Sequence, residues 1–355
     1  MKTKDMTLTM LKQQLKRFGN VIFFLIIMGL TIYAVLHGQN LDEIATSLRE
    51  ITLPYLFCAV MVALFFVGAE GVIIWSLLRS MHGNSGLIKC IGYAFVGFFY
   101  SGITPSASGG QPMQLLYMKR DGNRLSESSV VLMTVALLYK FVLVCMGIGI
   151  LLFWRQPLRG YLRGYYGLFL IGMVLNTSLV LVLLGAMLAP VLIRHILFAI
   201  DYLLVKLHIL KPSSDRRLRI DHFIGGYQEA VLFLKSHLLK VFGAILFTFF
   251  QRICVFGLPF IVYQGFSLEG SSFLTILCLQ TSIYIAVDML PIPGAQGITE
   301  LMYRTVFQTV FTGAYLMPGL YVTRGISFYL MLGVSLLVML AFQIHEKRAL
   351  IHVFE

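Results

Sequence analysis

Six apolar runs, each long enough to cross a lipid bilayer as a helix, dominate this 355-residue sequence. A crossing helix needs about 20 predominantly apolar residues. Only helices and closed barrels cross lipid, because no water is present there to satisfy free N–H and C=O groups. Hydrophobic residues make up 58% of the chain and charged residues 12%, far from the soluble average. We therefore expect an all-α polytopic membrane protein, with too few residues outside the apolar runs to build a soluble core.

Two further segments are apolar but broken. The predicted full crossings are 20–37, 54–78, 128–153, 165–189, 241–265 and 319–343. The broken segments are 87–118, which contains TPSASGGQP, and 271–317, which contains LPIPGAQG. Each joins two apolar stretches through a Pro/Gly-rich break. We expect each segment to be a re-entrant hairpin of two half-helices that meet inside the membrane.

Lysine and arginine orient these crossings. Four segments are basic: the leader 1–19, Lys119–Arg124, Lys206–Arg219 and the tail 344–355. All four fall on one side of the membrane if the domain 20–343 has six crossings and two hairpins, and basic loops face the cytoplasm. The sequence thus predicts a multi-pass membrane protein with both termini in the cytoplasm. One loop disagrees, because QPLRGYLRGYYG and the arginine before it place three arginines outside: Arg155, Arg159 and Arg163.

The run Lys206–Arg219 lies in a predicted cytoplasmic linker, 190–237, and follows the amphipathic stretch APVLIRHILFAIDYLLVK. A basic amphipathic segment binds the surface of an anionic leaflet, so we expect contact with anionic lipids of the inner leaflet. Nucleic acid is the rival partner for a basic run. It is disfavoured because neither interleaved aromatic residues nor a soluble fold accompanies the charges.

The two broken segments enter the membrane from opposite sides in this topology. One lies in each half of the chain, as in an inverted repeat, although the halves share only a proline, a Gly-rich turn and a following half-helix. Irregular backbone at membrane depth is tolerated where it lines a cavity. Helices beginning at Pro112 and at about Ile298 would point free N–H groups at that cavity and favour an anion there. The alternative is that both breaks are packing turns.

Ionisable residues inside or beside the apolar runs mark candidate binding positions, because charges are costly in lipid and usually face a cavity, a partner or a substrate. They are Glu70, Lys140, Arg252, Asp288, Glu300 and Arg304. Plainer roles remain open: Glu300 could cap its half-helix or pair with Arg304, and Asp288 could pair with Lys140 or Arg252. Arg324, near a helix end, is expected to extend its charge to the interface.

No sequence feature calls for a metal or a cofactor. The five cysteines are Cys58, Cys90, Cys145, Cys254 and Cys278; all lie in apolar surroundings without CxxC spacing and are expected to be free thiols. The eight histidines form no HExxH pattern, and neither a GxSxG nor a Walker sequence is present. We therefore expect no cofactor and no catalytic residue.

The motifs TPSASGGQPMQLLYMKRDG and LPIPGAQGITE resemble the two signature breaks of the flippase-like integral membrane family. That family includes the membrane half of the bacterial lysylphosphatidylglycerol synthases, also called multiple peptide resistance factors, and the resemblance runs from about Asn20 to Ile344. The motif positions are Pro105, Gly109, Gly110, Pro112, Pro293, Gly294, Gly297 and Glu300. Ala295 stands where the family usually has a second glycine. The full synthases continue into a soluble aminoacyl-transferase domain, and this sequence ends at Glu355. The resemblance therefore implies a lipid-translocating unit without the synthase activity.

Together these features predict a protein that moves a phospholipid between leaflets. Arg252 and the half-helix ends would hold the phosphate, and Glu70, Asp288 and Glu300 would meet a cationic or hydroxylated part of the head group. An aminoacylated phosphatidylglycerol carries both signs. Three alternatives remain open: a polyprenyl-phosphate or glycolipid carrier, a lipid-modifying enzyme with Glu300 or Asp288 as base, and a membrane scaffold. Homodimer formation is also left open.

Overall fold

The computed structural model describes Tyr33 and residues 41–81, 83–207 and 213–351, and every regular element in it is helical. The predicted leader 1–19 and the first crossing, 20–37, lie outside the described residues except for Tyr33. Contacts divide the chain into residues 1–47 and 48–355. The first unit is described only at Tyr33 and at the start of α2 (Leu41–Glu50). All helices discussed below belong to the second unit.

Five of the predicted crossings are present as apolar helical segments long enough to span a membrane. They are α3 (Leu53–Ser80); α6 (Leu125–Phe153); α7 (Arg155–Leu162), η2 (Arg163–Tyr165) and α8 (Tyr166–Leu188); α11 (Leu238–Phe256) and α12 (Leu258–Gly265); and α15 (Leu316–Arg324), the π-helix η5 (Gly325–Leu330) and α16 (Met331–Ile351). Each is apolar on most of its faces, which suits a helix surrounded by lipid and other helices. The protein is thus an all-α, multi-pass membrane protein.

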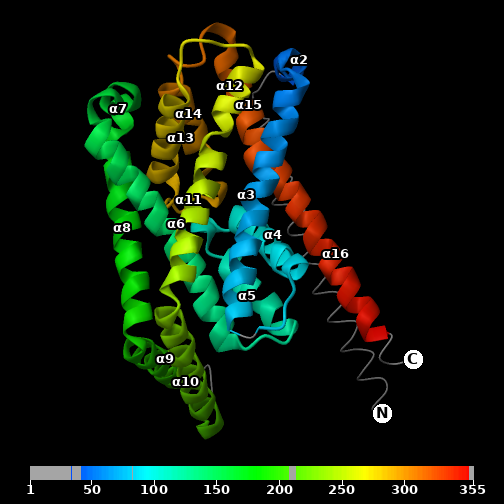
Figure 1. Cartoon of the computed structure of the whole chain (residues 1–355), viewed down its shortest axis with the longest axis vertical. Coiled ribbons are helices and arrows are strands. Elements are labelled where there is room, and N and C mark those ends of the chain that lie inside the picture. Colours follow the sequence, from blue (N-terminus) through cyan, green and yellow to red (C-terminus); the bar gives the residue numbers. More distant parts are fainter. Residues whose placement is uncertain (1–32, 34–40, 82, 208–212, 352–355) are drawn as a thin grey trace. The chain divides into compact units, whose positions relative to one another are not determined.

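Each broken segment is a pair of shorter helices (Figure 1). The first segment comprises α4 (Leu87–Ile103), η1 (Pro105–Ala107) and α5 (Gly110–Arg120). The second comprises α13 (Phe273–Val287), η3 (Pro293–Ala295) and α14 (Ile298–Val306), followed by η4 (Gly313–Tyr315). At 17 residues, α4 is about 25 Å long. It therefore falls short of a typical crossing, as do α5, α13 and α14.

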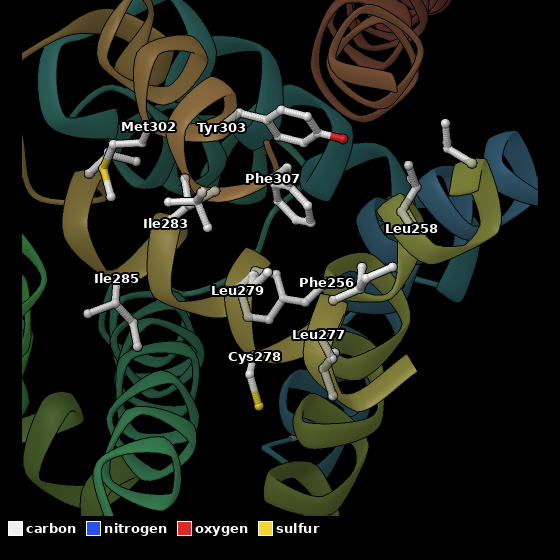
Figure 2. Packing of buried hydrophobic residues seen from close by; sticks show 14 of the residues in the cluster. Phe256, Leu258, Leu277, Cys278, Leu279, Ile283, Ile285, Met302, Tyr303 and Phe307 are labelled. Atoms are coloured by element: carbon white, nitrogen blue, oxygen red, sulfur yellow. The ribbon is translucent and has the colours of Figure 1, made fainter. Parts of the chain in front are cut away.

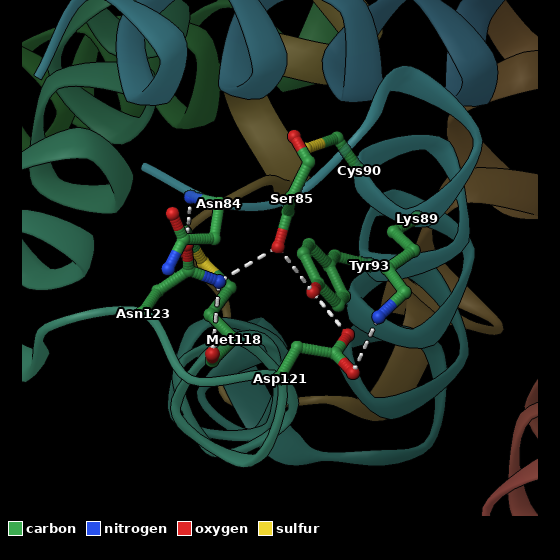
Figure 3. A network of polar contacts seen from close by, with 8 residues as sticks. All are labelled: Asn84, Ser85, Lys89, Cys90, Tyr93, Met118, Asp121 and Asn123. Atoms are coloured by element: carbon green, nitrogen blue, oxygen red, sulfur yellow. Dashed lines mark hydrogen bonds and ion pairs between the residues drawn. The ribbon is translucent and has the colours of Figure 1, made fainter. Parts of the chain in front are cut away.

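A polar network closes the base of the first segment (Figure 3). Lys89, near the start of α4, forms an ion pair of 3.0 Å with Asp121, just after α5. Asn123 donates from Nδ2 to Ser85 Oγ at 2.7 Å, and Tyr93 bonds both Asp121 and Ser85. The chain therefore enters and leaves this segment at one place, as a helical hairpin requires.

The two hairpins lie toward opposite ends of α6. At its Leu125 end, α6 follows α5 directly, and α10 (Ser214–Ser236) packs with Gly226 against Ser126. At its other end, α6 runs into α7, and α14 packs against α7. Arg163 also donates to Gln308 Oε1 at 3.4 Å there. Figure 1 shows α4 and α5 toward one end of α6, and α13 and α14 toward the other.

The linker between the halves is helical, and α9 (Pro190–Lys206) packs against α10. Asp201 is buried and forms an ion pair with Arg216, and a longer one of 4.0 Å with Arg217. Tyr227 donates to the Ala186 carbonyl at 3.1 Å, which ties α10 to the end of α8. Part of the positive charge of the basic run is thus paired within the protein.

The largest buried apolar cluster packs α13 and α14 against α11 and α12 (Figure 2). Phe256, Leu279 and Ile283 are almost fully enclosed. Tyr303 of α14 stacks on Phe307, with ring centroids 4.3 Å apart. This packing holds the second hairpin firmly in the bundle.

Candidate functional site

The two Pro/Gly breaks meet in space although about half the chain separates them. The turn η1 contacts η3, and α4 also contacts η3. Ser106 Oγ donates to the Leu290 carbonyl at 3.4 Å. Because the hairpins come from opposite ends of α6, this contact joins them tip to tip. We call the region of η1, η3 and the residues that bond them the break junction.

The two breaks share the backbone conformation of their first turn and differ after it, where Ser108 is helical and Gln296 is extended. Each turn begins at a proline, Pro105 or Pro293, and the residue before the proline is extended. Two left-handed residues follow: Ser106 and Ala107 with φ of 51° and 55°, and Gly294 and Ala295 with φ of 58° and 50°. An alanine thus occupies the second left-handed position in both breaks. Ala295, which stands where the family usually has a glycine, therefore adopts a left-handed conformation. This conformation costs a non-glycine residue roughly 1–2 kcal/mol.

The motif glycines have different tasks. A side chain on Gly110 would lie 2.1 Å from Ser101 Oγ and 2.8 Å from the Gly97 carbonyl, so this glycine allows α5 to approach α4. The Gly109 N–H donates to Thr104 Oγ1 at 2.9 Å. Gly297 has φ of 80° and open space around its α-carbon. The helix α5 begins at Gly110 rather than at Pro112, whereas α14 begins at Ile298 as expected.

Glu300 lies at the centre of the second break. Its Oε2 accepts from the Gly297 N–H at 2.6 Å, which is the predicted capping role. Its Oε1 forms an ion pair of 2.9 Å with Arg324 Nε, and Arg324 also donates to the Gly294 carbonyl at 3.0 Å. Arg304, the partner considered from the sequence, is exposed instead.

Arg324 is therefore a site residue that the sequence reasoning missed. Its side chain is only 15% exposed and points into the break, so it does not extend to the interface as expected. Arg324 is the last residue of α15 and directly precedes the π-helical stretch η5, and such bulges often occur at functional sites. The sequence did contain a signal for Arg324: an arginine near the start of an apolar run, and a glutamate beside a nearby break.

Lys140 of α6 forms an ion pair with Asp288, directly before the second break. Their side chains are 18% and 14% exposed. Lys140 Nζ also lies 3.4 Å from Met289 Sδ. Of the two partners considered for Asp288, the structure selects Lys140.

Glu70 of α3 belongs to a separate polar network. Gln114 Nε2 donates to Oε1 at 2.6 Å, and the Tyr139 hydroxyl donates to Oε2 at 3.2 Å. Gln251 Nε2 donates to the Tyr139 oxygen at 2.8 Å. Four helices, α3, α5, α6 and α11, thus contribute to one chain of hydrogen bonds inside the bundle.

Arg252, the next residue on α11, is 3% exposed and sits among aromatic rings. Its guanidinium carbon lies 4.6–5.7 Å from the ring centroids of Tyr139, Tyr284, Phe66 and Phe256. Its Nε and Nη1 atoms have no hydrogen-bond partner, and within the described part of the chain no carboxylate pairs with it. Cation–π contacts of this kind contribute about 0.5–2 kcal/mol each. Arg252 thus has two unpaired donor atoms inside the bundle.

Among the described residues, no group of three His, Cys, Asp or Glu side chains could hold a metal ion. Residues 20–335 match a protein-family model described as "Lysylphosphatidylglycerol synthase TM region". No curated protein matches the chain.

Proposed function

The chain belongs to the family of the lysylphosphatidylglycerol synthase transmembrane region, and from that premise we propose that it moves a phospholipid between the leaflets of the bacterial inner membrane. The observation that carries this proposal is the break junction. A polar head group crosses a bilayer only where protein replaces the water it loses. Exposed, irregular backbone from two opposed hairpins offers such a route, while the acyl chains stay in lipid.

The charges near the junction favour a head group with both signs. Lys140–Asp288 and Glu300–Arg324 are neutral as pairs. A phosphate and an ammonium that enter together can exchange partners with such pairs, so that every charge keeps a partner. This is important because a buried charge without a partner has a large free-energy penalty. Arg252 lies against the ring of Tyr284, which is one helical turn before Asp288 on α13, and it would bind the phosphate. These features favour an aminoacylated phosphatidylglycerol over a polyprenyl phosphate, whose head group lacks the cation.

Sealed vesicles test the proposal directly. Ser108 is exposed at the first break and has ordinary helical backbone angles, so Ser108→Trp adds bulk to the route without backbone strain. We expect vesicles with the parent protein to move labelled lysylphosphatidylglycerol between leaflets and Ser108→Trp to lose most of that movement. The control is Leu152→Trp, at an exposed position near the end of α6.

Equal rates for the parent and Ser108→Trp would contradict a route through the break junction. Absence of movement by the parent, or chemical conversion of the lipid in detergent, would contradict transport itself. The second of these results would favour the enzyme alternative.

A further inference from the structure

Glu70 is a carboxyl group inside an apolar crossing with no cation bound to it. The two side chains that donate hydrogen bonds to it, Gln114 and Tyr139, are both neutral. Among the described residues it forms no ion pair, in contrast to Asp288 and Glu300. An ionised carboxylate in such a place usually acquires a cationic partner or takes up a proton.

The charged and titratable groups around Glu70 are few. Tyr139 faces it from α6 and Arg252 acts on it from α11. Arg252 in turn faces Tyr284 and Asp288, and Asp288 is held by Lys140. The Tyr139 ring lies against Arg252 while its hydroxyl bonds Glu70, so one side chain separates a buried anion from a buried cation.

We propose that Glu70 is a proton-binding site that couples lipid movement to the proton gradient. This inference rests on the proposed function and adds its energy source. When Glu70 is ionised, its charge offsets that of Arg252. When Glu70 takes a proton from water at one membrane face, that charge is removed and Arg252 attracts a phosphate more strongly. The proton and the anionic head group therefore bind together, and release of the proton at the other face weakens phosphate binding again.

The hydrogen bonds around Glu70 suit both of its forms. The acid can donate to the Tyr139 oxygen, whose own hydroxyl can turn away; Gln251 Oε1 is buried nearby without a partner. Gln114 and Gln251 hold the group in place in either case.

Gln114 connects this site to the first break. It is 3% exposed, lies about one turn into α5, and fits against the α-carbon of Gly97 on α4. A change in the Glu70–Gln114 bond on protonation therefore acts on the helix that begins at the break. Glu70 is thereby placed to influence the break junction without being part of it.

Infrared difference spectra of the purified protein at high and low pH test proton binding without any transport. We expect the carbonyl stretch of a protonated carboxylic acid to appear on acidification in the parent, to shift in Glu70→Asp, and to be lost in Glu70→Gln. The matched control is Glu229→Gln, on the exposed side of α10. A titrating band in Glu70→Gln equal to that of the parent would overturn the assignment.

Sealed vesicles with an imposed pH gradient test the coupling. Parent protein should accumulate labelled lysylphosphatidylglycerol in one leaflet several-fold in a direction set by the gradient, and a proton ionophore should abolish the bias. Glu70→Gln should lose this dependence, whereas Glu229→Gln should retain it. Lipid movement by the parent that ignores the gradient would overturn the coupling and leave the proposed function intact. Failure of the parent to move lipid at all would count against the proposed function and the coupling, while the infrared titration would still decide proton binding.

Discussion

Charged side chains within the bundle are stabilised in three different ways. Lys140–Asp288 and Glu300–Arg324 are ion pairs. Glu70 is held by neutral donors, and Arg252 lies among four aromatic rings. Removing one partner of an ion pair leaves a buried charge, which costs roughly 3–5 kcal/mol. Removing a charged side chain that has no ion-pair partner leaves no unpaired charge behind.

The arginines Arg324 and Arg304 should therefore differ when each is changed to glutamine. Arg324→Gln leaves Glu300 without its counter-ion and should lower the free energy of unfolding by roughly 3 kcal/mol. Arg304→Gln, at an exposed position, should change it by no more than about 0.5 kcal/mol. Thermal unfolding in detergent measures both, and Glu300→Gln/Arg324→Gln should recover part of the loss. Equal stability of the two single variants would show that Arg304 contributes as much as Arg324.

Arg252→Gln and Lys140→Gln provide a second comparison. Lys140→Gln strands Asp288 and should destabilise the protein by roughly 3 kcal/mol. Arg252→Gln breaks no ion pair, so it should lower thermal stability less than Lys140→Gln does. Added anionic lipid should stabilise the parent through binding to the folded state, and should stabilise Arg252→Gln much less. Equal stabilisation by lipid would remove Arg252 from the binding site.

The sequence placed Glu70, Lys140 and Arg252 inside the bundle, but it also included the exposed Arg304, and it left the partners of the charges open. Periodicity and apolar context are local, so they identify Glu70, Lys140 and Arg252 as residues at membrane depth. Pairing depends on which helices adjoin. The bond between Glu300 and Arg324 joins α14 to α15, and nothing in the spacing distinguishes it from a pair with Arg304 one turn away.

At the scale of the element, the hairpin α4–α5 depends on close contact of its two helices. Gly110 lies against Gly97 and Ser101, and Lys89 and Asp121 close the base. The first break therefore has a packing role in addition to the route we propose.

The elements themselves were well predicted, since α3 and α6 differ from the expected crossings by at most three residues at either end. The break between α11 and α12 and the π-helix η5 were not predicted; Gly257 and Pro259 were a signal for the first, whereas η5 arises inside an apolar run.

Glycine substitutions test this packing. Gly110→Leu should separate α5 from α4 and destabilise the hairpin by more than 2 kcal/mol, at the upper end of the about 1–3 kcal/mol typical of overpacking. Gly68→Leu in α3 meets no atom within 4 Å and should fold like the parent. Thermal unfolding and protease resistance of the 121–124 turn report the difference. A stable Gly110→Leu protein would mean that α4 and α5 can separate freely.

At the scale of the whole molecule, the described helices place α7 at the opposite end of α6 from Arg124. The arginine-rich loop that conflicts with the charge rule is thus separated from the basic segment Lys119–Arg124 by the length of α6. Its helix stays folded partly through contacts within the loop, such as Arg159 over the Tyr166 ring at 5.0 Å. A count of lysines and arginines does not take such contacts within a loop into account.

Single cysteines in a cysteine-free background give the orientation. We expect cysteines at Arg124, Arg217 and Lys347 to react only with reagents that reach the cytoplasm, and a cysteine at Arg159 to react from outside. Membrane-impermeant maleimide on intact cells, compared with lysed cells, measures this. Labelling of the Arg217 position from outside would contradict the topology.

Reversible cross-linking of the break junction tests the central claim most directly. In a cysteine-free background, Ser106→Cys and Leu290→Cys lie close enough for a short, cleavable bifunctional thiol reagent, because Ser106 bonds the Leu290 backbone. A cross-link between Lys89→Cys and Asp121→Cys, at the base of the first hairpin, is the control. If lipid passes where the breaks meet, the Ser106–Leu290 cross-link should stop lipid movement in sealed vesicles, cleavage should restore it, and the control should have little effect. Undiminished movement with the Ser106–Leu290 cross-link fully formed would contradict the account.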